Sequence, residues 1–266
     1  MIILRRGDRL PSVALLQSYL NQESSSTDFL TVDGIFGPRT ETAIRNFRAA
    51  HRLGTGSIAD DRVWHGVVGR EWQIIDSVDR SDHDSPLARR RIEDHRDLSP
   101  YGQTVLQQFG MSNGTAPAVR SVQAQARLGQ VVLLRFHGHG SPGNMILASG
   151  VDGNAASSLH QGYGAGFFRW LDLLRPIFAR MGSVEMHGCR VGQGHAGRSL
   201  LLGMANALGV PVTAGINNQL GGGTTTFRFE GPTRTICPND EPLRDWARRV
   251  GSVSVPRPSP QRPARR

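Results

Sequence analysis

Two short segments of the chain each place reactive side chains next to glycine. Residues 137–140 read His-Gly-His-Gly after an apolar run, and residues 187–189 read His-Gly-Cys after a second one. A cysteine attacks substrates as its thiolate, and a thiol with the usual pKa of about 8.5 needs a neighbouring imidazole to ionise near neutral pH. These residue types therefore predict a cysteine nucleophile with a histidine as its general base.

The position of each segment after an apolar run indicates that a strand delivers it. A short apolar run that ends at glycine is typical of a buried strand in a parallel sheet, and catalytic groups gather beyond the carboxyl ends of such strands. If the two strands are adjacent and parallel, His139 and Cys189 meet at one edge of the sheet. The wider pattern predicts an α/β domain with a mostly parallel sheet. Its expected elements are strands near 130–137, 183–188 and 210–214 and helices over 167–181 and 197–208.

With these motifs, residues 119–236 resemble the caspase-like cysteine peptidases, in which one core strand ends in His-Gly and another ends in Cys. The resemblance implies that Cys189 is the nucleophile and His139 its base. It also implies that the backbone N–H groups of Gly140 and Cys189 form the oxyanion hole, where one lost donor typically costs about 3 kcal/mol of transition-state stabilisation. The implied activity is hydrolysis of peptide bonds in a protein or peptide substrate.

Two choices within this predicted site stay open. His137 is the alternative base because it also precedes a glycine, although the Ser-Pro-Gly turn at 141–143 follows His139, as it does in the relatives. Asp152 and Glu185 are candidates for an acidic pocket that binds a basic side chain of the substrate.

The same side chains allow two other interpretations. One is a zinc-dependent wall hydrolase whose metal ligands are His137, His139, His187 and Cys189. Structural zinc sites usually draw their ligands from loops with other spacings, so we expect neither a metal nor another cofactor. The other is a catalytically inactive caspase-like protein that binds on peptidoglycan, with Cys189 as a small buried apolar residue.

The first part of the chain has the patterning of a small helical module. Apolar residues recur at helical spacing over 13–20, and an Asp-Gly turn at 33–34 separates this helix from a second one near Pro38, where a helix can start. A third helix is expected near 60–68. These features predict a compact all-α unit.

Residues 1–70 resemble the three-helix peptidoglycan-binding domain in these motifs. The resemblance implies that peptidoglycan is a partner of the protein. Arg48 stands where this family usually has glutamine. The candidate contact residues are Asp33, Gly34, Phe36 and Arg39.

The predicted fold class is therefore a small all-α peptidoglycan-binding domain followed by an α/β caspase-like domain with a mostly parallel sheet. The polar stretch 77–86, which lacks an apolar periodicity, is expected to be part of a linker. The expected divisions are 1–70 for the helical module, 71–118 for a linker and lead-in, 119–250 for the caspase-like domain and 251–266 for a disordered Pro/Arg-rich tail.

Composition limits the partners and the cellular setting. The mean hydropathy is −0.32, and the chain lacks the apolar stretch of about 18 residues that a membrane span needs. The net charge of +9 is expected to serve adhesion to anionic cell walls or solubility rather than binding to nucleic acid. The chain has two cysteines, Cys189 and Cys237, which is too few for a fold stabilised by several disulfides.

These observations together predict a bacterial, cell-wall-targeted cysteine peptidase. The first residues do not resemble a signal peptide. We therefore expect export by a specialised secretion route to the periplasm, the cell wall or a target cell.

Overall fold

The computed structural model describes residues 2–24, 29–68, 72–79, 104–108, 115–147, 158–160, 162, 168–220 and 227–251. Asp152, residues 80–86 of the expected linker and residues 252–266 of the expected tail lie outside these ranges. The predictions made for them stay predictions.

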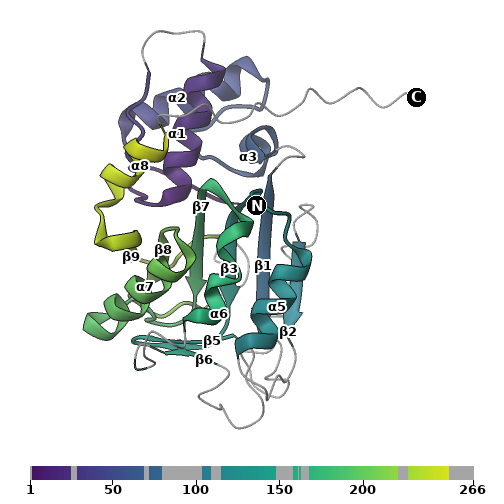
Figure 1. Ribbon diagram of the computed structural model, residues 1–266. Helices are drawn as coiled ribbons and strands as arrows, with labels where there is room; N and C mark the ends of the chain where they lie inside the picture. Colours follow the sequence, from purple (N-terminus) through teal and green to yellow (C-terminus); the bar gives the residue numbers. More distant parts are fainter. Residues whose placement is uncertain are drawn as a thin grey trace.

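A six-stranded sheet forms the centre of the α/β part, in the order β2-β1-β3-β7-β8-β9 (Figure 1). Its strands are β1 (Gln73–Asp79), β2 (Thr104–Gln108), β3 (Val131–His137), β7 (Phe178–His187), β8 (Val212–Gly215) and β9 (Thr233–Ile236). Every neighbouring pair is parallel except β8 and β9. The predicted mostly parallel sheet is confirmed, and its three expected strands correspond to β3, β7 and β8.

One face of this sheet is apolar and is covered by helices (Figure 1). Ile75, Leu134 and Val184 belong to one buried apolar cluster with Leu201. The helices that cover this face are α5 (Thr115–Gln125), α6 (Arg169–Asp172) and α7 (Gly194–Leu208). Apolar burial at alternate strand positions is the main force that holds these layers together.

The opposite face of the sheet carries a transverse row of polar side chains. The strand register places Asp76 opposite Arg135, and Arg135 opposite Glu185. The row continues with Thr213 opposite Glu185 and Thr235 opposite Thr213. Because directly opposite residues of neighbouring strands share a face, this register aligns the polar side chains across the sheet.

The segment 167–181 differs from its prediction as a single helix. It contains the short helix α6, the 3-10 turn η3 (Arg175–Ile177) and then the start of β7 at Phe178. Pro176 cannot donate a helical hydrogen bond, and Gly182 allows β7 to approach β3, since a Cβ there would lie 2.8 Å from the O of Val131. The apolar residues that suggested a helix therefore begin a buried strand.

The expected linker also differs, because residues 77–79 are the end of β1. β1 lies between the edge strand β2 and β3, so it is paired on both sides. The polar residues of β1 interrupt its apolar pattern, so the sequence did not predict a strand here. Asp76, Ser77 and Asp79 are nevertheless all buried. The buried partners of Asp76 are described below.

The helical N-terminal region is confirmed. It consists of α1 (Pro11–Glu23), α2 (Pro38–Ala50) and α3 (Asp61–Val68). Val13, Leu16 and Leu20 of α1 are buried, as the helical spacing predicts. Gly34 has a φ of 73°, in the left-handed region that the turn before α2 requires.

The core of this helical region continues into the rest of the chain. Helix α8 (Leu243–Gly251) packs against α1, and Trp246 belongs to the same buried cluster as Leu16. The cluster also includes Ala179 and Met181 of β7. Because α8 and β7 also pack against it, α1 is buried on more than one face rather than along a single apolar stripe.

A small antiparallel sheet lies beyond the carboxyl end of β3, at the far end of the molecule from α1 and α2 (Figure 1). It contains β4 (Gly140–Ser141), β5 (Asn144–Ile146) and β6 (Ser158–His160). A second 3-10 turn, η5 (Pro238–Asp240), precedes α8. Within the described ranges, the helices lack the length and apolar character that crossing a bilayer requires.

Candidate active site and wall-binding groove

The strand register brings the two predicted catalytic residues to the same edge of the sheet. β3 and β7 are adjacent and parallel, with His137 opposite His187. His139 and Cys189 follow just beyond these last paired positions, where the carboxyl ends of the two strands lie side by side. Both residues are partly exposed. The adjacency of the two strands, on which the pairing of the two residues depends, is confirmed.

The glycines at this edge are required by close packing of the main chain. A Cβ at Gly140 would lie 3.1 Å from the backbone N of Cys189 and 2.4 Å from a methyl group of Val191. A Cβ at Gly188 would lie 2.5 Å from the sulfur of Met145. Without these Cβ atoms, the backbone of Gly140 lies directly against that of Cys189.

The loop 216–220 runs alongside Cys189 and shapes its surroundings. The thiol of Cys189 donates a hydrogen bond to the O of Gln219 at 3.4 Å, and the N–H of Arg190 donates to the O of Asn217 at 2.9 Å. Arg190 has a φ of 55°, in the left-handed region, where a residue with a Cβ is strained by about 1 kcal/mol or more. Strain of this kind is concentrated at functional sites.

A shallow groove of about 510 Å³ opens next to this loop. Its polar lining comes from Arg190, Gln193, Asn217, Asn218 and Glu230. An oxygen of Glu230 accepts the N–H of Leu220 at 2.8 Å, so this carboxylate is bound to the main chain. The exposed guanidinium of Arg190 forms no ion pair within the described ranges and leaves a positive charge on the groove.

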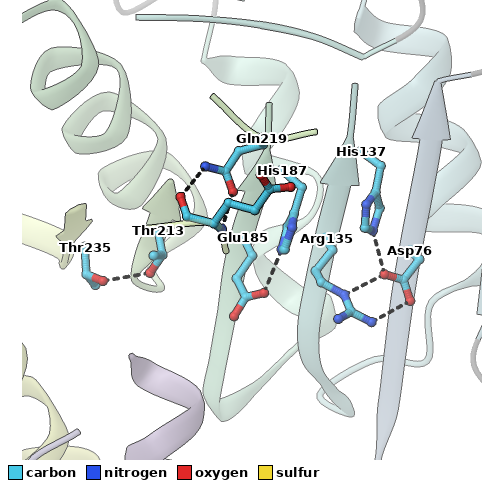
Figure 2. A network of polar contacts seen from close by, with 9 residues as sticks. Asp76, Arg135, His137, Glu185, His187, Thr213, Gln219 and Thr235 are labelled. Atoms are coloured by element: carbon cyan, nitrogen blue, oxygen red, sulfur yellow. Dashed lines mark hydrogen bonds and ion pairs between the residues drawn. The ribbon is translucent and has the colours of Figure 1, made fainter. Parts of the chain in front are cut away.

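His137, the alternative base, is held inside the protein by Asp76 (Figure 2). Its Nε2 lies 3.0 Å from Oδ1 of Asp76, and the residue is 3% exposed. Arg135 donates to both oxygens of the same carboxylate, from Nε at 2.6 Å and from Nη2 at 3.1 Å. Burial alone raises the pKa of Asp76, but the Arg135 guanidinium and His137 outweigh it and hold that pKa well below its usual range. Of the two candidate bases, His139 is the more accessible.

His187 is also buried and is paired with Glu185 (Figure 2). Its Nε2 lies 3.0 Å from Oε2 of Glu185. The ring stacks between those of His137 and Phe229, with centroid distances of 5.0 Å and 4.3 Å. Burial lowers the pKa of His187 even though the Glu185 hydrogen bond opposes the shift, so the imidazole is neutral near pH 7.

These pairings do not produce the ligand set that the zinc interpretation requires. The Nε2 atoms of His137 and His187 are directed to Asp76 and Glu185, not to a shared centre with Cys189. Among the residues that the structure describes, no group of three or more His, Cys, Asp and Glu side chains could hold a metal ion.

The structure does not bring Glu185 together with Cys189 as part of a substrate pocket. Glu185 is 3% exposed, faces the polar side of the sheet and lines a cavity with Asp8 of the N-terminal segment. Asp152, the other candidate for an acidic pocket, is among the residues outside the described ranges.

Three of the four predicted wall-contact residues support the fold of the helical module. Gln17 is 2% exposed, and its amide oxygen accepts the N–H groups of Asp33 and Gly34, each at 3.0 Å. Its amide nitrogen donates to Oδ1 of Asp33 at 3.0 Å. Phe36 is 1% exposed and lies in the core, so it cannot contact a ligand in this conformation. The Asp-Gly turn is thus held in place by Gln17.

The fourth residue, Arg39, lines a groove of about 490 Å³ between the end of α1 and α2. Phe47 and His51 form its aromatic wall, with ring centroids 4.2 Å apart. Asn46 and Glu23 contribute polar groups. Apolar and aromatic surface with a few polar groups is the usual make-up of a ligand site.

Arg48 acts within the fold rather than at this groove. It is 5% exposed and donates from Nη1 to Oδ1 of Asp60 at 2.8 Å and from Nη2 to the O of Leu53 at 2.9 Å. It therefore fastens the chain between α2 and α3.

Sequence reasoning missed Asp76 and Arg135, which anchor the polar face of the sheet. Arg135 interrupts the apolar run of β3, and a charge inside a buried strand needs a buried counter-ion. The charged residue within the apolar run of β3 could have indicated that a buried acidic partner exists. The position of its partner within β1 could not be found, because β1 has no apolar pattern that marks it as a strand.

Comparisons with known proteins agree with the helical module. Residues 9–65 match the family model described as a putative peptidoglycan binding domain. No curated protein matches the chain. A solved structure described as an aromatic amino acid aminotransferase with 3-indolebutyric acid is similar over 91% of this chain at 12% identity and a TM-score of 0.32. The chain spans 57% of that protein, and a TM-score this low carries no argument about fold or function.

Proposed function

We propose that the protein is a cell-wall-targeted cysteine peptidase that hydrolyses peptide bonds with Cys189 and His139. His139 takes the thiol proton, and the sulfur of Cys189 attacks the substrate carbonyl. Collapse of the tetrahedral intermediate releases the amine, which receives the proton from His139, and leaves a thioester. Water, activated by the same histidine, then hydrolyses the thioester and regenerates the thiol.

The observation that carries this proposal is the pairing of β3 with β7. Their parallel register, with His137 opposite His187, places the segments that bear His139 and Cys189 at one edge. The contact of Gly140 with the backbone of Cys189 supports an oxyanion hole formed by their N–H groups, because the two main chains lie close together.

The groove lined by Arg190, the residue that follows Cys189, is the proposed place for the substrate chain. Its lining is mostly polar and can form hydrogen bonds with an extended peptide. The exposed guanidinium of Arg190 favours peptides with acidic side chains near the cleaved bond. The expectation of a basic side chain, which relied on Asp152 and Glu185, is not supported by the position of Glu185.

The helical module supplies the proposed attachment to peptidoglycan. The family match over residues 9–65 supports this role, and the groove lined by Arg39, Asn46 and Phe47 is the proposed contact surface. Delivery to the periplasm, wall or target cell by a specialised secretion route remains part of the proposal.

The direct test is peptide-bond hydrolysis by the full chain. We expect cleavage of a peptide library with acidic residues, loss of all turnover in Cys189→Ala and retained turnover in the matched control Cys237→Ala. Turnover that survives Cys189→Ala would falsify the mechanism. Sacculus binding without any turnover or thiol reactivity would indicate the inactive binding protein instead.

A further inference from the structure

A second cavity separates the N-terminal segment from the polar face of the sheet. Its volume is about 400 Å³. One wall comes from residues 2–10, and the other comes from Glu185 of β7 and residues 227–235. Apart from Gly231, these residues differ from those that line the groove next to the loop 216–220, so the cavity is a separate feature.

Glu185 presents an unused carboxylate oxygen at this cavity. The residue is 3% exposed, and its Oε2 is occupied by Nε2 of His187 at 3.0 Å. Among the described residues, Oε1 of Glu185 has no hydrogen-bond partner. A carboxylate oxygen at the wall of a cavity accepts hydrogen bonds, so this position favours a ligand that donates them or carries positive charge.

Groups of both charges share the cavity with Glu185. Asp8, whose Oδ2 accepts the N–H of Arg5 at 2.8 Å, and Arg228 both line it. Burial raises the pKa of Asp8, with Arg228 lowering and Glu185 raising it through their charges, which indicates that the three groups lie close enough to interact. The cavity is therefore lined by both acidic and basic groups.

Besides Arg9, Thr233 and Thr235, the rest of the wall is mostly apolar. Ile3, Leu4, Leu10, Phe227 and Phe229 line it. An apolar surface with a few charged groups suits a small organic molecule whose charges lie at its ends and whose body is apolar.

We propose that this cavity binds a small zwitterion of amino-acid or dipeptide size, with its ammonium group at Glu185 and its carboxylate at Arg228. An ammonium group has three donors and satisfies the free oxygen of Glu185. A guanidinium matches a carboxylate with two parallel hydrogen bonds. The apolar wall accommodates the side chains of the ligand.

Binding at this place also links two parts of the chain. Because the walls come from the N-terminal segment and from the sheet, the ligand contacts both and stabilises their packed arrangement. A ligand that binds only the folded chain raises its melting temperature with concentration. This effect does not depend on Cys189, so it can be measured whether or not the protein is a peptidase.

The dipeptide Ala-Leu, titrated into the full chain, tests the proposal. We expect saturable binding at millimolar concentrations or below, together with a rising melting temperature. N-acetyl-Ala-Leu lacks the ammonium group and Ala-Leu amide lacks the carboxylate, and each is expected to bind at least tenfold more weakly. Absence of binding by Ala-Leu, or equal binding by all three compounds, would overturn the proposal.

Two variants locate the site. Arg228→Gln leaves the His187 contact of Glu185 intact and is expected to weaken Ala-Leu binding at least tenfold, as is Glu185→Gln. Arg244→Gln, at an exposed position of α8, serves as the matched control and is expected to bind normally. Ala-Leu binding that Arg228→Gln leaves unchanged would contradict the assignment even if Glu185→Gln failed to fold.

Discussion

Asp76 and Arg135 are the most deeply buried charged pair described in this chain, each 0% exposed. Asp76 joins Arg135 of β3 to His137 at the end of the same strand. A buried pair of this kind contributes little net stability compared with apolar residues, but removing one partner leaves an uncompensated charge. The pair therefore fixes how β1 and β3 align.

Asp76→Asn is expected to destabilise the protein by about 3–5 kcal/mol, because Arg135 would lose its counter-ion in a buried site. Urea unfolding followed by circular dichroism measures the change. Asp172→Asn, at an exposed position of α6, is the control and is expected to stay within about 0.5 kcal/mol of the original chain. A similar small change for Asp76→Asn would show that Arg135 finds compensation elsewhere.

His187 gives the protein a pH dependence in mild acid. Burial lowers its pKa in the folded state, so the unfolded chain binds the proton more readily. Stability is therefore complete above the unfolded pKa of about 6.5 and falls as the pH drops below it. We expect His187→Gln to lose part of this slope between about pH 6.5 and 5. His65→Gln, at an exposed position, is the control, and an unchanged slope in His187→Gln would contradict the assignment.

At the scale of elements, the candidate site depends on β7 and the segments that follow it. β7 contacts α1 and α8 near its start, pairs with β3 along its length and ends just before Cys189. Helix α8 closes the other side of α1, and Trp246 is 2% exposed in their shared core. The helical module is therefore packed against two elements that come later in the chain, β7 and α8.

Trp246→Ala is expected to destabilise the protein by about 3–5 kcal/mol, since it leaves a large cavity between α8 and α1. Thermal unfolding of the full chain measures this loss. Arg248→Ala, on the exposed side of α8, is the matched control. If Trp246→Ala proved as stable as the control, α8 would not be part of the module's core.

The sequence predicted elements with a clear apolar period and failed where polar residues or a proline altered that pattern. Helices α1, α2 and α7 lie where helical patterning predicted them, and β3 and β8 lie where apolar runs predicted strands. β1 was missed because Asp76, Ser77 and Asp79 are polar but buried, and the stretch that ends at Met181 was assigned to a helix because its apolar residues lack a distinct spacing. That the strands before His139 and Cys189 are adjacent could be stated only as a condition, because strand order depends on contacts between distant segments.

At the scale of the whole molecule, the helical module and the candidate catalytic edge lie at opposite ends (Figure 1). The module packs near the start of β7, and Cys189 lies just past its end. A strand of 10 residues spans roughly 33 Å. If the protein binds peptidoglycan through the groove of α1 and α2, Cys189 therefore faces away from the cell wall.

The full chain is expected to sediment with purified sacculi, and Arg39→Ala should weaken this binding severalfold because it removes a charged group from the groove. Arg62→Ala, at an exposed position of α3, controls for the general attraction of a basic protein to an anionic wall. The experiment is done at moderate salt, which screens that attraction. Equal losses in both variants would mean that binding depends on charge alone.

The most direct test of the central claim is the rate at which iodoacetamide modifies each thiol at neutral pH. Burial, with the nearby charge of Glu241, raises the pKa of Cys237 to about 12, so this thiol should react very slowly. Cys189 is expected to react at least tenfold faster than Cys237, and His139→Ala is expected to remove most of that advantage. If Cys189 reacted at the same rate with and without His139, the two residues would not form a catalytic pair.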